Sequence, residues 1–562
     1  MRASALFAPT LRQAPQGIAL RGQALLLRGA FANRFAGGAY GLLPLGAGVM
    51  GRISDTVREK MRGMGASPVT LPAMASRPSG GEAASQPAPV SGAAPRGGGK
   101  WAHIKSVHFD LCREMVAAHA RSYGDLPILA YDTLTWSRAD AKASLGLLGA
   151  SESLETHVWA FCADGVQLAA MHQRAAQALG EVVAGCGLEV LEAKAWDEWT
   201  EKMTLLVWEH ESGPLQVVHC GACGWAADVE GATCAAVTGT RPAPAEPMAE
   251  VVTPNATTVA AVTEMLGIGA ERLVKTLIYV ADGRLVAALV RGDHELDEAK
   301  WARALDCLEL RMATAPEIEQ VTGGPVGFSG PVGLKGIEMV GDYAVSAMAD
   351  FVTGANAADK HLRGVNLDRD FTVDRFADLR RLDLRDPCPS CGGRLAAKNG
   401  FALGGVASLR NGAPEFGTPS VQAMDGSRVP ILVLEAWLDL TRVMAASAEA
   451  HCGENGIVWP VRIAPFQVHL LLLDASDAAM SAAADSLYQD MQANGLDVLY
   501  DDRDERAGVK FHDADLFGIP YVVVIGRRLE REGLVEVRTR ASGAECLVAP
   551  ERVPEALRGE LC

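Results

Sequence analysis

The chain has 562 residues, too many for a single hydrophobic core, so we expect three or four domains. Hydrophobic residues make up 49% and charged residues 21% of the sequence, which is typical of globular domains, and no apolar run is long enough to span a bilayer. The formal net charge of -16 argues against a protein that coats DNA or other nucleic acid indiscriminately, and residues 1–6 lack the apolar core of a signal peptide. We therefore expect a cytoplasmic protein without membrane or DNA partners.

The N-terminal third alternates helical and turn signals. Amphipathic spacing predicts a helix over 53–64, and a break at 65–67 precedes a strand over 68–71. Residues 77–99 are almost wholly Pro, Gly, Ala and Ser, and such a segment buries too little apolar surface to offset its ordering entropy. We predict a disordered loop there. Beyond it we predict a helix over 108–121, a strand over 128–136 and a helix over 168–185.

A Pro-rich seam over 241–247 is typical of a linker and precedes two further units. The first, over 253–385, is predicted to be α+β. Its expected elements are a helix over 257–266 and strands over 276–280 and 285–291. The second begins near Val458 and alternates apolar strands with a helix, which predicts a mixed sheet with helices packed on it. Its expected elements are strands over 468–473, 498–500 and 521–525 and a helix over 478–494.

Several strings resemble bacterial prolyl-tRNA synthetases. Residues 38–46 and the helix over 57–61 resemble the first class II motif, which builds the dimer interface in that family. Residues 253–255, 274–277 and 290–296 resemble the inserted editing domain, and 456–466 and 501–520 resemble the anticodon-binding domain. The likeness covers most of the chain, whereas 77–107 and 395–435 match poorly.

The resemblance implies an α/β and α+β multidomain protein. A class II antiparallel-sheet catalytic domain would occupy 1–240 and, after an inserted α+β editing domain over 250–387, residues 388–456. A mixed α/β anticodon-binding domain would occupy 457–562. The implied partners are tRNA for proline, tRNA(Pro), and a second copy of the chain in a homodimer.

The amino-acid-activating site departs from the family pattern in its second motif. Arg138 stands at the position of the family's phosphate-contacting arginine, and Asp140 stands where the family has Glu. The arginines that follow in the family are replaced by Ser144, Gly149 and Ser151. Upstream, Val107-His108-Phe109-Asp110 replaces the Thr-His-Glu-Glu that holds the proline amine, which removes charge-assisted hydrogen bonds to the ammonium group.

The third motif also departs from the family pattern at nucleotide-binding positions. Arg442 survives, but Trp437 and Asp439 stand where the family has glycines that let the backbone approach the nucleotide, and Ala402 and Gly405 replace a nearby Glu and His. We expect Trp437 to fill the adenine shelf and Asp439 to repel a triphosphate. The interpretation is that proline activation is lost, so ATP and Mg²⁺ would bind only if ligase activity survives. A changed substrate, unrecognised compensation and a structural role for Arg138 and Arg442 stay open.

The editing region keeps the family's residues. Lys275 matches the lysine that contacts the tRNA end, and His361, Asp350 and Gly354 would line the pocket. The Gly-rich segment 327–333 would supply backbone N–H groups to the ester. Taken alone, Lys275 would be a surface lysine and His361 a satisfied core or surface histidine.

A dense charge run follows the strand over 498–500. By resemblance it meets the anticodon, where carboxylates accept hydrogen bonds from guanine and arginines stack or pair with phosphate. The alternative is a solvated turn. The expected tRNA contacts are Asp501, Asp502, Arg503, Glu505, Arg506 and Lys510.

Four of the 12 cysteines form two Cys-x-x-Cys pairs that bracket the editing region: Cys220 with Cys223, and Cys388 with Cys391. Together they could form a four-thiolate structural zinc site, although the long separation between the pairs is not a standard finger spacing. Plain reduced thiols and redox chemistry are the alternatives.

The leading hypothesis is a degenerate homodimeric paralogue that binds tRNA(Pro) and hydrolyses mischarged alanine from it. The first alternative is a functional proline–tRNA ligase. The second is a non-catalytic tRNA-binding regulator, in which editing is lost as well.

Overall fold

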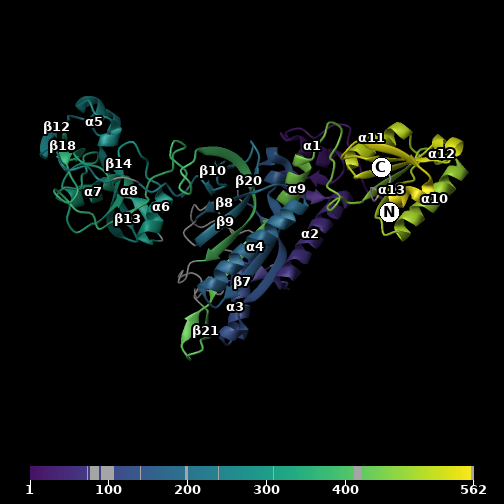
Figure 1. Ribbon diagram of the computed structural model, residues 1–562, viewed down its shortest axis with the longest axis horizontal. Coiled ribbons are helices and arrows are strands. Elements are labelled where there is room, and N and C mark those ends of the chain that lie inside the picture. The colour runs from purple at the N-terminus through teal and green to yellow at the C-terminus, as the bar shows by residue number, and fades with distance from the viewer. Residues whose placement is uncertain are drawn as a thin grey trace. The chain divides into compact units, whose positions relative to one another are not determined.

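The computed structural model describes residues 1–72, 107–138, 141–196, 200–237, 240–307, 309–409 and 419–557, with backbone only for 74–75, 88–89 and 107–110. Asp140 and, apart from the backbone of 88–89, the predicted loop over 77–99 lie outside the described residues. The chain divides into two compact units (Figure 1). Unit 1 comprises Met1–Leu191, Leu205–Trp208 and Ala402–Cys562, and unit 2 comprises Glu192–Thr204 and Glu209–Phe401.

An antiparallel sheet forms the centre of unit 1. Strand β7 (Glu152–Cys162) pairs with β6 (Ile128–Ser137) on one side and with β23 (Leu432–Asp439) on the other, and β23 pairs with β20 (Leu395–Leu409). The short β3 (Ser67–Pro68) runs parallel to β6. Because paired residues of antiparallel strands point to the same face, His157 and Trp437, which are in register, share one face of the sheet.

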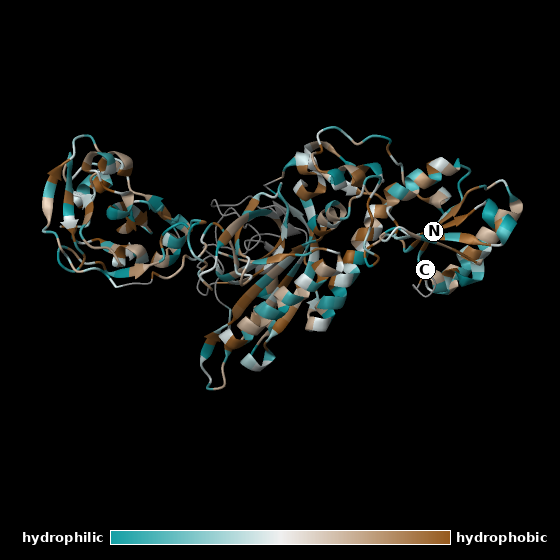
Figure 2. Cartoon of the chain, turned by 45° about the horizontal axis from the view of Figure 1, so that its top comes forward, coloured by the Kyte–Doolittle hydropathy of each residue, from teal (hydrophilic) through white to brown (hydrophobic). Residues whose placement is uncertain are grey.

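Long helices pack on this sheet. Helix α2 (Pro44–Met64) has Pro44 in its first turn and ends at Gly65 in the left-handed region, the arrangement favoured at helix ends. Helix α4 (Gly165–Gly185) begins at Asp164, whose carboxylate accepts from Val166 and Gln167, and it packs against α2 and β23. Figure 2 shows apolar and polar colours alternating along the helices of this region, as expected of helices with one buried face. Helices α1 (Arg21–Arg28), α3 (Val107–His119) and α9 (Leu440–Ala450) complete the set.

The C-terminal part of unit 1 has its own mixed sheet, in the order β25-β24-β26-β27-β28. Strand β24 (Val468–Leu472) runs parallel to β25 (Val498–Asp501) and to β26 (Tyr521–Ile525), whereas β27 (Val535–Thr539) and β28 (Ala544–Val548) are antiparallel. The larger helices are α10 (Ala478–Ala493) and α11 (Ala507–Phe517), with α12 (Arg527–Glu532) and α13 (Val553–Leu557) beyond them. This is the mixed α/β arrangement that the sequence predicts.

Unit 2 contains two sheets of the inserted region. The larger has the order β15-β13-β14-β16-β19, in which β13 (Val274–Ala281) and β14 (Arg284–Arg291) form an antiparallel hairpin. Its other strands are β15 (Leu310–Met312), β16 (Glu338–Asp342) and β19 (Arg375–Ala377). The smaller sheet joins β12 (Ala249–Val252), β18 (Lys360–Val365) and β17 (Phe351–Gly354).

Four helices accompany these sheets: α5 (Val259–Leu266), α6 (Glu298–Leu305), α7 (Ala315–Thr322) and α8 (Tyr343–Ser346). An apolar core that includes Ile278, Leu289 and Phe351 joins the sheets and helices into one α+β body. Outside the inserted region, unit 2 also holds β8 (Leu191–Ala195), β10 (Leu215–Cys220) and β11 (Ala226–Asp228). Across both units, no helix of the described residues has the length and apolar character needed to cross a membrane.

Candidate functional site

In unit 1, two buried arginines converge on one carboxylate, that of Asp439. Asp439 is the N-cap of α9, and its Oδ1 accepts a hydrogen bond from the backbone N–H of Arg442 (2.8 Å). Its Oδ2 lies 2.8 Å from a guanidinium nitrogen of Arg138 and 3.7 Å from Nε of Arg442. The side chains of Arg138 and Asp439 are 7% and 5% exposed, so solvent screens the pair weakly.

This geometry corrects the expected role of Asp439. The carboxylate of Asp439 would not repel a triphosphate as an isolated negative charge, because Arg138 and Arg442 already neutralise it. Arg442 also donates to the backbone carbonyls of Leu148 (3.3 Å) and Ala402 (3.2 Å), which fixes its position. Asp439 therefore engages the same two arginines that the sequence assigned to nucleotide phosphates.

A second buried charge group lies on the same face of the sheet. His157 Nδ1 is 3.0 Å from Glu435 Oε1, and Nε2 is 3.3 Å from Glu155 Oε2. Burial alone would lower the pKa of His157, but hydrogen bonds to Glu155 and Glu435 outweigh it and raise the pKa to about 9. The histidine is thus a buried cation between two carboxylates. The sequence reasoning missed this group, because β7 and β23 are buried along most of their length and show no simple alternation.

Trp437 occupies the interior of this sheet. It is 2% exposed and lies in register between His157 of β7 and Gly405 of β20. At the neighbouring Gly404, a Cβ atom would stand 2.4 Å from the carbonyl oxygen of Trp437, so glycine is needed for the two strands to approach. The indole is therefore part of the packed core of the sheet.

Unit 2 contains a cavity of about 250 Å³ beside β13. Three of the predicted site residues, Lys275, Gly354 and His361, line it together with apolar side chains such as Val262 and Leu273. His361 is 4% exposed, and its Nδ1 lies 2.7 Å from the Thr253 hydroxyl, which orients the ring. Burial lowers the pKa of His361, so the ring is neutral at pH 7.

Thr276, which the sequence reasoning did not single out, also lines this cavity. It is 7% exposed, and its buried hydroxyl has no hydrogen-bond partner among the described residues. A buried hydroxyl without a partner costs about 1–3 kcal/mol, so such a group facing a cavity indicates a site for water or a polar ligand.

The Gly-rich segment forms one edge of the cavity through close backbone packing. A Cβ atom at Gly330 would stand 1.8 Å from the carbonyl oxygen of Gly354, which excludes any side chain there. The side chain of Asn356 holds the segment: its Oδ1 accepts from Gly330 N–H (2.8 Å), and its Nδ2 donates to the carbonyls of Gly330 (3.1 Å) and Val332 (3.0 Å). Asn356 thereby fixes backbone groups that the sequence assigned to the ester.

The ammonium group of Lys275 is held by two oxygen acceptors. Its Nζ donates to the backbone carbonyl of His294 and lies 3.3 Å from Glu295 Oε1. These two acceptors use two of its three donors, and the side chain is 15% exposed at the cavity wall.

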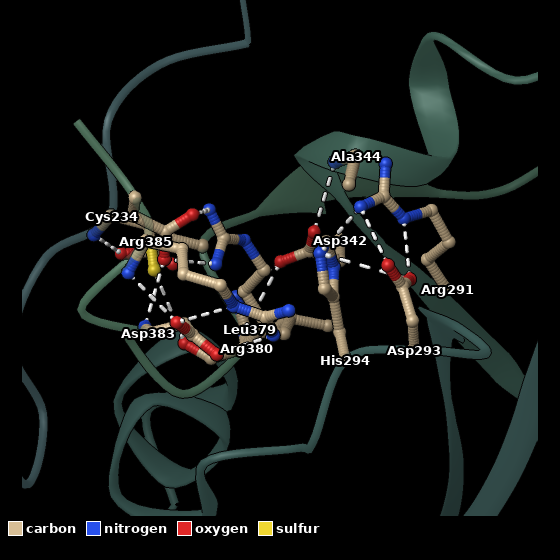
Figure 3. Close-up of polar contacts among 12 residues, drawn as sticks. Cys234, Arg291, Asp293, His294, Asp342, Ala344, Leu379, Arg380, Asp383 and Arg385 are labelled. Atoms are coloured by element: carbon tan, nitrogen blue, oxygen red, sulfur yellow. Dashed lines mark hydrogen bonds and ion pairs between the residues drawn. The ribbon is translucent and has the colours of Figure 1, made fainter. Parts of the chain in front are cut away.

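His294 is itself fixed within a polar network (Figure 3). Its Nε2 accepts from Arg291 (2.8 Å), while burial and the charges of Arg291 and Arg380 lower the pKa of His294. Arg380 makes a bidentate pair with Asp386 (2.6 and 2.8 Å), and Asp342 accepts from the backbone N–H groups of Leu379 and Arg380. The carbonyl that holds Lys275 thus belongs to a segment braced by several ion pairs.

Asp350 does not line the cavity, contrary to the sequence prediction. Its carboxylate accepts from the backbone N–H groups of Ala245 (2.9 Å) and Glu246 (3.2 Å) and from Asn366 Nδ2 (2.8 Å). These bonds lower its pKa. Asp350 therefore anchors the predicted linker instead, from a position with left-handed backbone (φ 50°).

The four predicted cysteines come together in unit 2. Their sulfur atoms all lie within 4.8 Å of one another, with 3.6 Å between Cys220 and Cys391 and 3.7 Å between Cys223 and Cys388. Tetrahedral zinc with bonds of about 2.3 Å would separate sulfurs by ~3.8 Å, so the set fits this ion. The separation along the chain is bridged because β10 pairs with the first part of β20, placing Cys220 opposite Leu395.

The turns around the sulfurs are shaped for close approach. Gly224 and Gly392 adopt φ values of 74° and 75°, and a Cβ atom at Gly393 would stand 3.1 Å from the Cys220 sulfur. Backbone N–H groups of Ala222 and Cys223 lower the pKa of Cys220 to about 7, which favours the thiolate that binds metal.

The predicted tRNA-contacting turn divides into a buried and an exposed part. Asp501 and Lys510 are fully buried: Arg503 donates to both oxygens of Asp501 (2.9 and 2.7 Å), and Lys510 donates to the carbonyls of Leu472 and Asp501. This corrects the expectation that Lys510 contacts a phosphate, because burial leaves it no surface to offer. Glu505 and Arg506 are exposed and Arg503 is half-buried.

The partners of Asp502 lie near the N-terminus of the chain. It accepts from the backbone N–H (3.0 Å) and hydroxyl (2.9 Å) of Ser4 and pairs with Arg2 (3.2 Å). Its role is therefore to hold the N-terminal segment against the turn.

Two family models match the chain. The model described as an aminoacyl-tRNA editing domain matches residues 253–371, and the one described as an anticodon binding domain matches residues 461–560.

Full-length relatives are proline–tRNA ligases. The chain is 36% identical to that of Heliobacterium modesticaldum over 581 residues, covering 98% of this chain and 97% of the relative. It is 34% identical to that of Moorella thermoacetica over 569 residues (97% and 96%) and 35% identical to that of Geobacter sulfurreducens over 564 residues (97% and 96%).

Among solved structures, the chain resembles the prolyl-tRNA synthetase of Cryptosporidium parvum complexed with halofuginone and AMPPNP. The TM-score is 0.52 at 10% sequence identity, and the match covers 96% of this chain and 77% of that chain. At this identity the likeness supports the fold alone.

Proposed function

Because the chain belongs to the proline–tRNA ligase family, we propose that it binds tRNA(Pro) and hydrolyses alanine wrongly attached to it, without activating proline. The predicted fold class, a class II synthetase fold with editing and anticodon-binding domains, is confirmed. We further propose that the chain acts in the cytoplasm as a homodimer.

The cavity beside β13 carries the proposal. It combines a small, largely apolar volume with a neutral oriented His361, a Lys275 held by two acceptors and a Thr276 hydroxyl that no described residue hydrogen-bonds. In the reaction, the alanyl methyl group would enter the apolar part. The hydroxyl of Thr276 and the fixed backbone of 327–330 would orient the ester and the attacking water, which is catalysis by positioning. Lys275 would meet a phosphate at the tRNA end.

Hydrolysis in a separate pocket suits this substrate. A proline site rejects alanine poorly, because the few methylenes that differ contribute only about 1–3 kcal/mol. A cavity of about 250 Å³ with apolar walls selects small side chains by size instead.

The loss of activation rests on unit 1. Asp439 binds the two surviving arginines, Trp437 fills the sheet where the family pattern has glycine, and the Glu155–His157–Glu435 group lies on the same face of the sheet. Binding ATP there would require Arg138 to give up its ion pair with the carboxylate of Asp439, which costs free energy because that charge stays buried.

Hydrolysis of alanyl-tRNA(Pro) tests the proposed activity. The purified chain should release alanine, and Thr276→Val, which keeps the shape and removes the hydroxyl, should slow release by about tenfold or more. Lys275→Ala should abolish release at low substrate concentration. Thr263→Val, at a half-buried position of α5 that does not line the cavity, is the matched control. Absence of hydrolysis by the unaltered chain would instead favour a non-catalytic tRNA-binding regulator.

A functional proline–tRNA ligase is the second candidate. The full-length similarity to enzymes of that name at 34–36% identity favours it, as does the convergence of Arg138 and Arg442 on one point. ATP and Mg²⁺ would then bind near these arginines. The two candidates differ in one observable, the formation of prolyl-adenylate.

We also propose a structural zinc ion held by Cys220, Cys223, Cys388 and Cys391. The sulfur spacing and the glycines that make room for it support this assignment. The ion would supply no chemistry to the cavity; it would tie β10 to the start of β20.

Metal analysis of the purified chain tests the zinc proposal. It should contain about one zinc per chain, and Cys388→Ser should lose the metal and lower the unfolding temperature. Cys452→Ser, at a cysteine outside the cluster, should retain it. A chain purified without chelators that contains no zinc would overturn the assignment.

A further inference from the structure

The four-cysteine cluster of unit 2 is built from two turns with the same backbone hydrogen bonds. In the first turn, the N–H of Cys220 donates to the carbonyl of Trp225 (2.8 Å), and the carbonyl of Cys220 accepts from the N–H of Gly224 (3.0 Å). The second turn, residues 388–393, repeats both bonds at 2.8 Å each. Each turn is therefore held by its own backbone and does not depend on a bond between its two sulfurs.

Contacts between the sulfurs cross from one turn to the other. Cys220 lies 3.6 Å from Cys391, and Cys223 lies 3.7 Å from Cys388. In each of these crossed pairs, one cysteine is buried and the other is exposed. Among the free cysteines of the described residues, the exposed ones are Cys223 and Cys391, so an oxidant in solution meets these two sulfurs first.

The backbone favours bonds across the turns over bonds within them. A disulfide within one turn would have to close over two intervening residues whose conformation the hydrogen bonds of the turn already fix. A disulfide across the turns requires each crossed pair to approach by roughly 1.6 Å, to the S–S length of about 2.05 Å. Strand β10 already pairs with the first part of β20, which brings the two turns together (Figure 1).

We propose that the cluster is a site of reversible oxidation by peroxide, which joins Cys220 to Cys391 and Cys223 to Cys388 in two disulfides. The same sulfurs are the ligands of the zinc ion proposed above. Release of that ion on oxidation rests on the zinc proposal, whereas the disulfides themselves do not require the ion.

Each disulfide forms in two steps. The thiolate of the exposed cysteine attacks one oxygen of the peroxide, the O–O bond breaks, and hydroxide leaves a sulfenic acid behind. The thiolate of the buried partner then attacks the sulfenic sulfur, which forms the S–S bond and displaces a second hydroxide. Two thiolates thus lose two electrons to one peroxide, and two protons from the solvent convert both hydroxides to water.

The crossed disulfides would preserve the connection between the two strands. They link positions that are 171 and 165 residues apart and keep the start of β20 tied to β10. They also use all four thiolates, so the proposed zinc ion loses its ligands. A thiol reductant that reopens both disulfides restores the ligand set.

Peptide mapping of the oxidised full chain tests the proposal. The chain is treated with about two molecules of hydrogen peroxide per chain, its remaining thiols are blocked with N-ethylmaleimide, and it is digested with trypsin without reduction. Trypsin separates the turns, because it cleaves after Arg385 and Arg394, on either side of the second turn. Mass spectrometry should find the peptides of the two turns joined, and apart after reduction. Separate peptides before reduction would overturn the proposal.

One variant identifies the partners within the joined peptides. Cys391→Ser should leave the peptides joined through Cys223 and Cys388, with Cys220 blocked by N-ethylmaleimide. A blocked Cys223 would contradict the assigned pairs. Cys452→Ser, at a half-buried cysteine outside the cluster, is the matched control and should give the same joined peptides as the unaltered chain.

The zinc and disulfide proposals fail separately. A chain that contains zinc but whose peptides stay apart after peroxide keeps the zinc assignment and loses the disulfides. Joined peptides from a chain without zinc remove the zinc assignment alone. Where both hold, oxidation should release about one zinc per chain to a chromogenic chelator, and reduction should restore binding of added Zn²⁺.

Discussion

His157 and His469 are both fully buried, yet their surroundings move their pKa values in opposite directions. Two carboxylates raise the pKa of His157 to about 9 despite burial. Around His469, burial together with the charges of Arg503, Arg540 and Lys510 outweighs the attraction of Asp501 and lowers the pKa to about 4. Neither ring nitrogen of His469 has a partner among the described residues. Unit 1 should therefore lose stability at both ends of the pH scale, for different reasons.

The loss of stability at alkaline pH is expected to come from His157. Because its folded pKa lies above the unfolded value of 6.5, its stabilisation is full below pH 6.5 and is lost as pH rises toward 9. The shift corresponds to about 3 kcal/mol. Protection factors of β7 amides, in which the base-catalysed intrinsic rate is divided out, should fall over this range in the unaltered chain and fall less in His157→Gln. An unchanged dependence in the variant would contradict the ion group.

The loss of stability at acid pH is expected to come from His469. Its folded pKa lies below the unfolded value, so stability present above pH 6.5 is lost as pH falls toward 4. At pH 5 the loss amounts to about 2 kcal/mol. His469→Leu should therefore raise the unfolding temperature at pH 5 more than at pH 8. Equal effects at the two pH values would show that His469 is not buried in its neutral form.

At the scale of elements, the apolar pattern predicted helices and strands well where one face is buried. The predicted helix over 53–64 is the second half of α2, because the Gly-rich residues 46–51 hide the periodicity of its first half, although Pro44 marks its start. Of the predicted strand over 68–71, only Pro68 belongs to a strand, which is β3. β7, β20 and β23 escaped notice, since buried strands with polar residues such as Glu155 and Glu435 do not alternate simply.

The Gly-rich segment 327–333 is an element whose geometry depends on one side chain. Asn356→Ala removes three hydrogen bonds to it and should slow alanyl-tRNA hydrolysis by about tenfold, since small displacements of positioning groups are costly. Binding of tRNA should change little, because the anticodon side is untouched. Asn399→Ala, at a position outside the cavity, serves as the control. Full activity of Asn356→Ala would show that the segment does not orient the ester.

At the scale of the whole molecule, sequence motifs indicated where the predicted sites lie. They did not distinguish residues that contact a ligand from residues that hold those contact residues in place. The sequence predicted Lys510 and Asp501 as RNA contacts, but both are buried inside the domain. It also predicted Asp350 as a pocket residue, whereas Asp350 anchors the linker. Conversely, Thr276 lies within the matching string 274–277 but was given no role, and only the cavity around it draws attention to its hydroxyl. Such distinctions depend on long-range packing, which local patterns do not encode.

The proposed function gives the two units different chemical tasks: hydrolysis in unit 2 and no amino-acid activation in unit 1. In unit 2 the cavity has an oriented histidine and a Thr276 hydroxyl that finds no partner among the described residues, which is compatible with the proposed site. In unit 1 the comparable positions satisfy one another, since Asp439 pairs with Arg138 and His157 pairs with Glu155 and Glu435. A protein that has kept its correction site and closed its activation site would depend on another enzyme to charge the tRNA.

Proline-dependent exchange of pyrophosphate into ATP tests that division most directly, because it reports prolyl-adenylate formation without requiring tRNA. The unaltered chain, at a concentration that hydrolyses alanyl-tRNA(Pro), should show no exchange above the level without proline. Exchange that requires proline and disappears in Arg138→Ala would contradict the closed activation site and establish the chain as a proline–tRNA ligase.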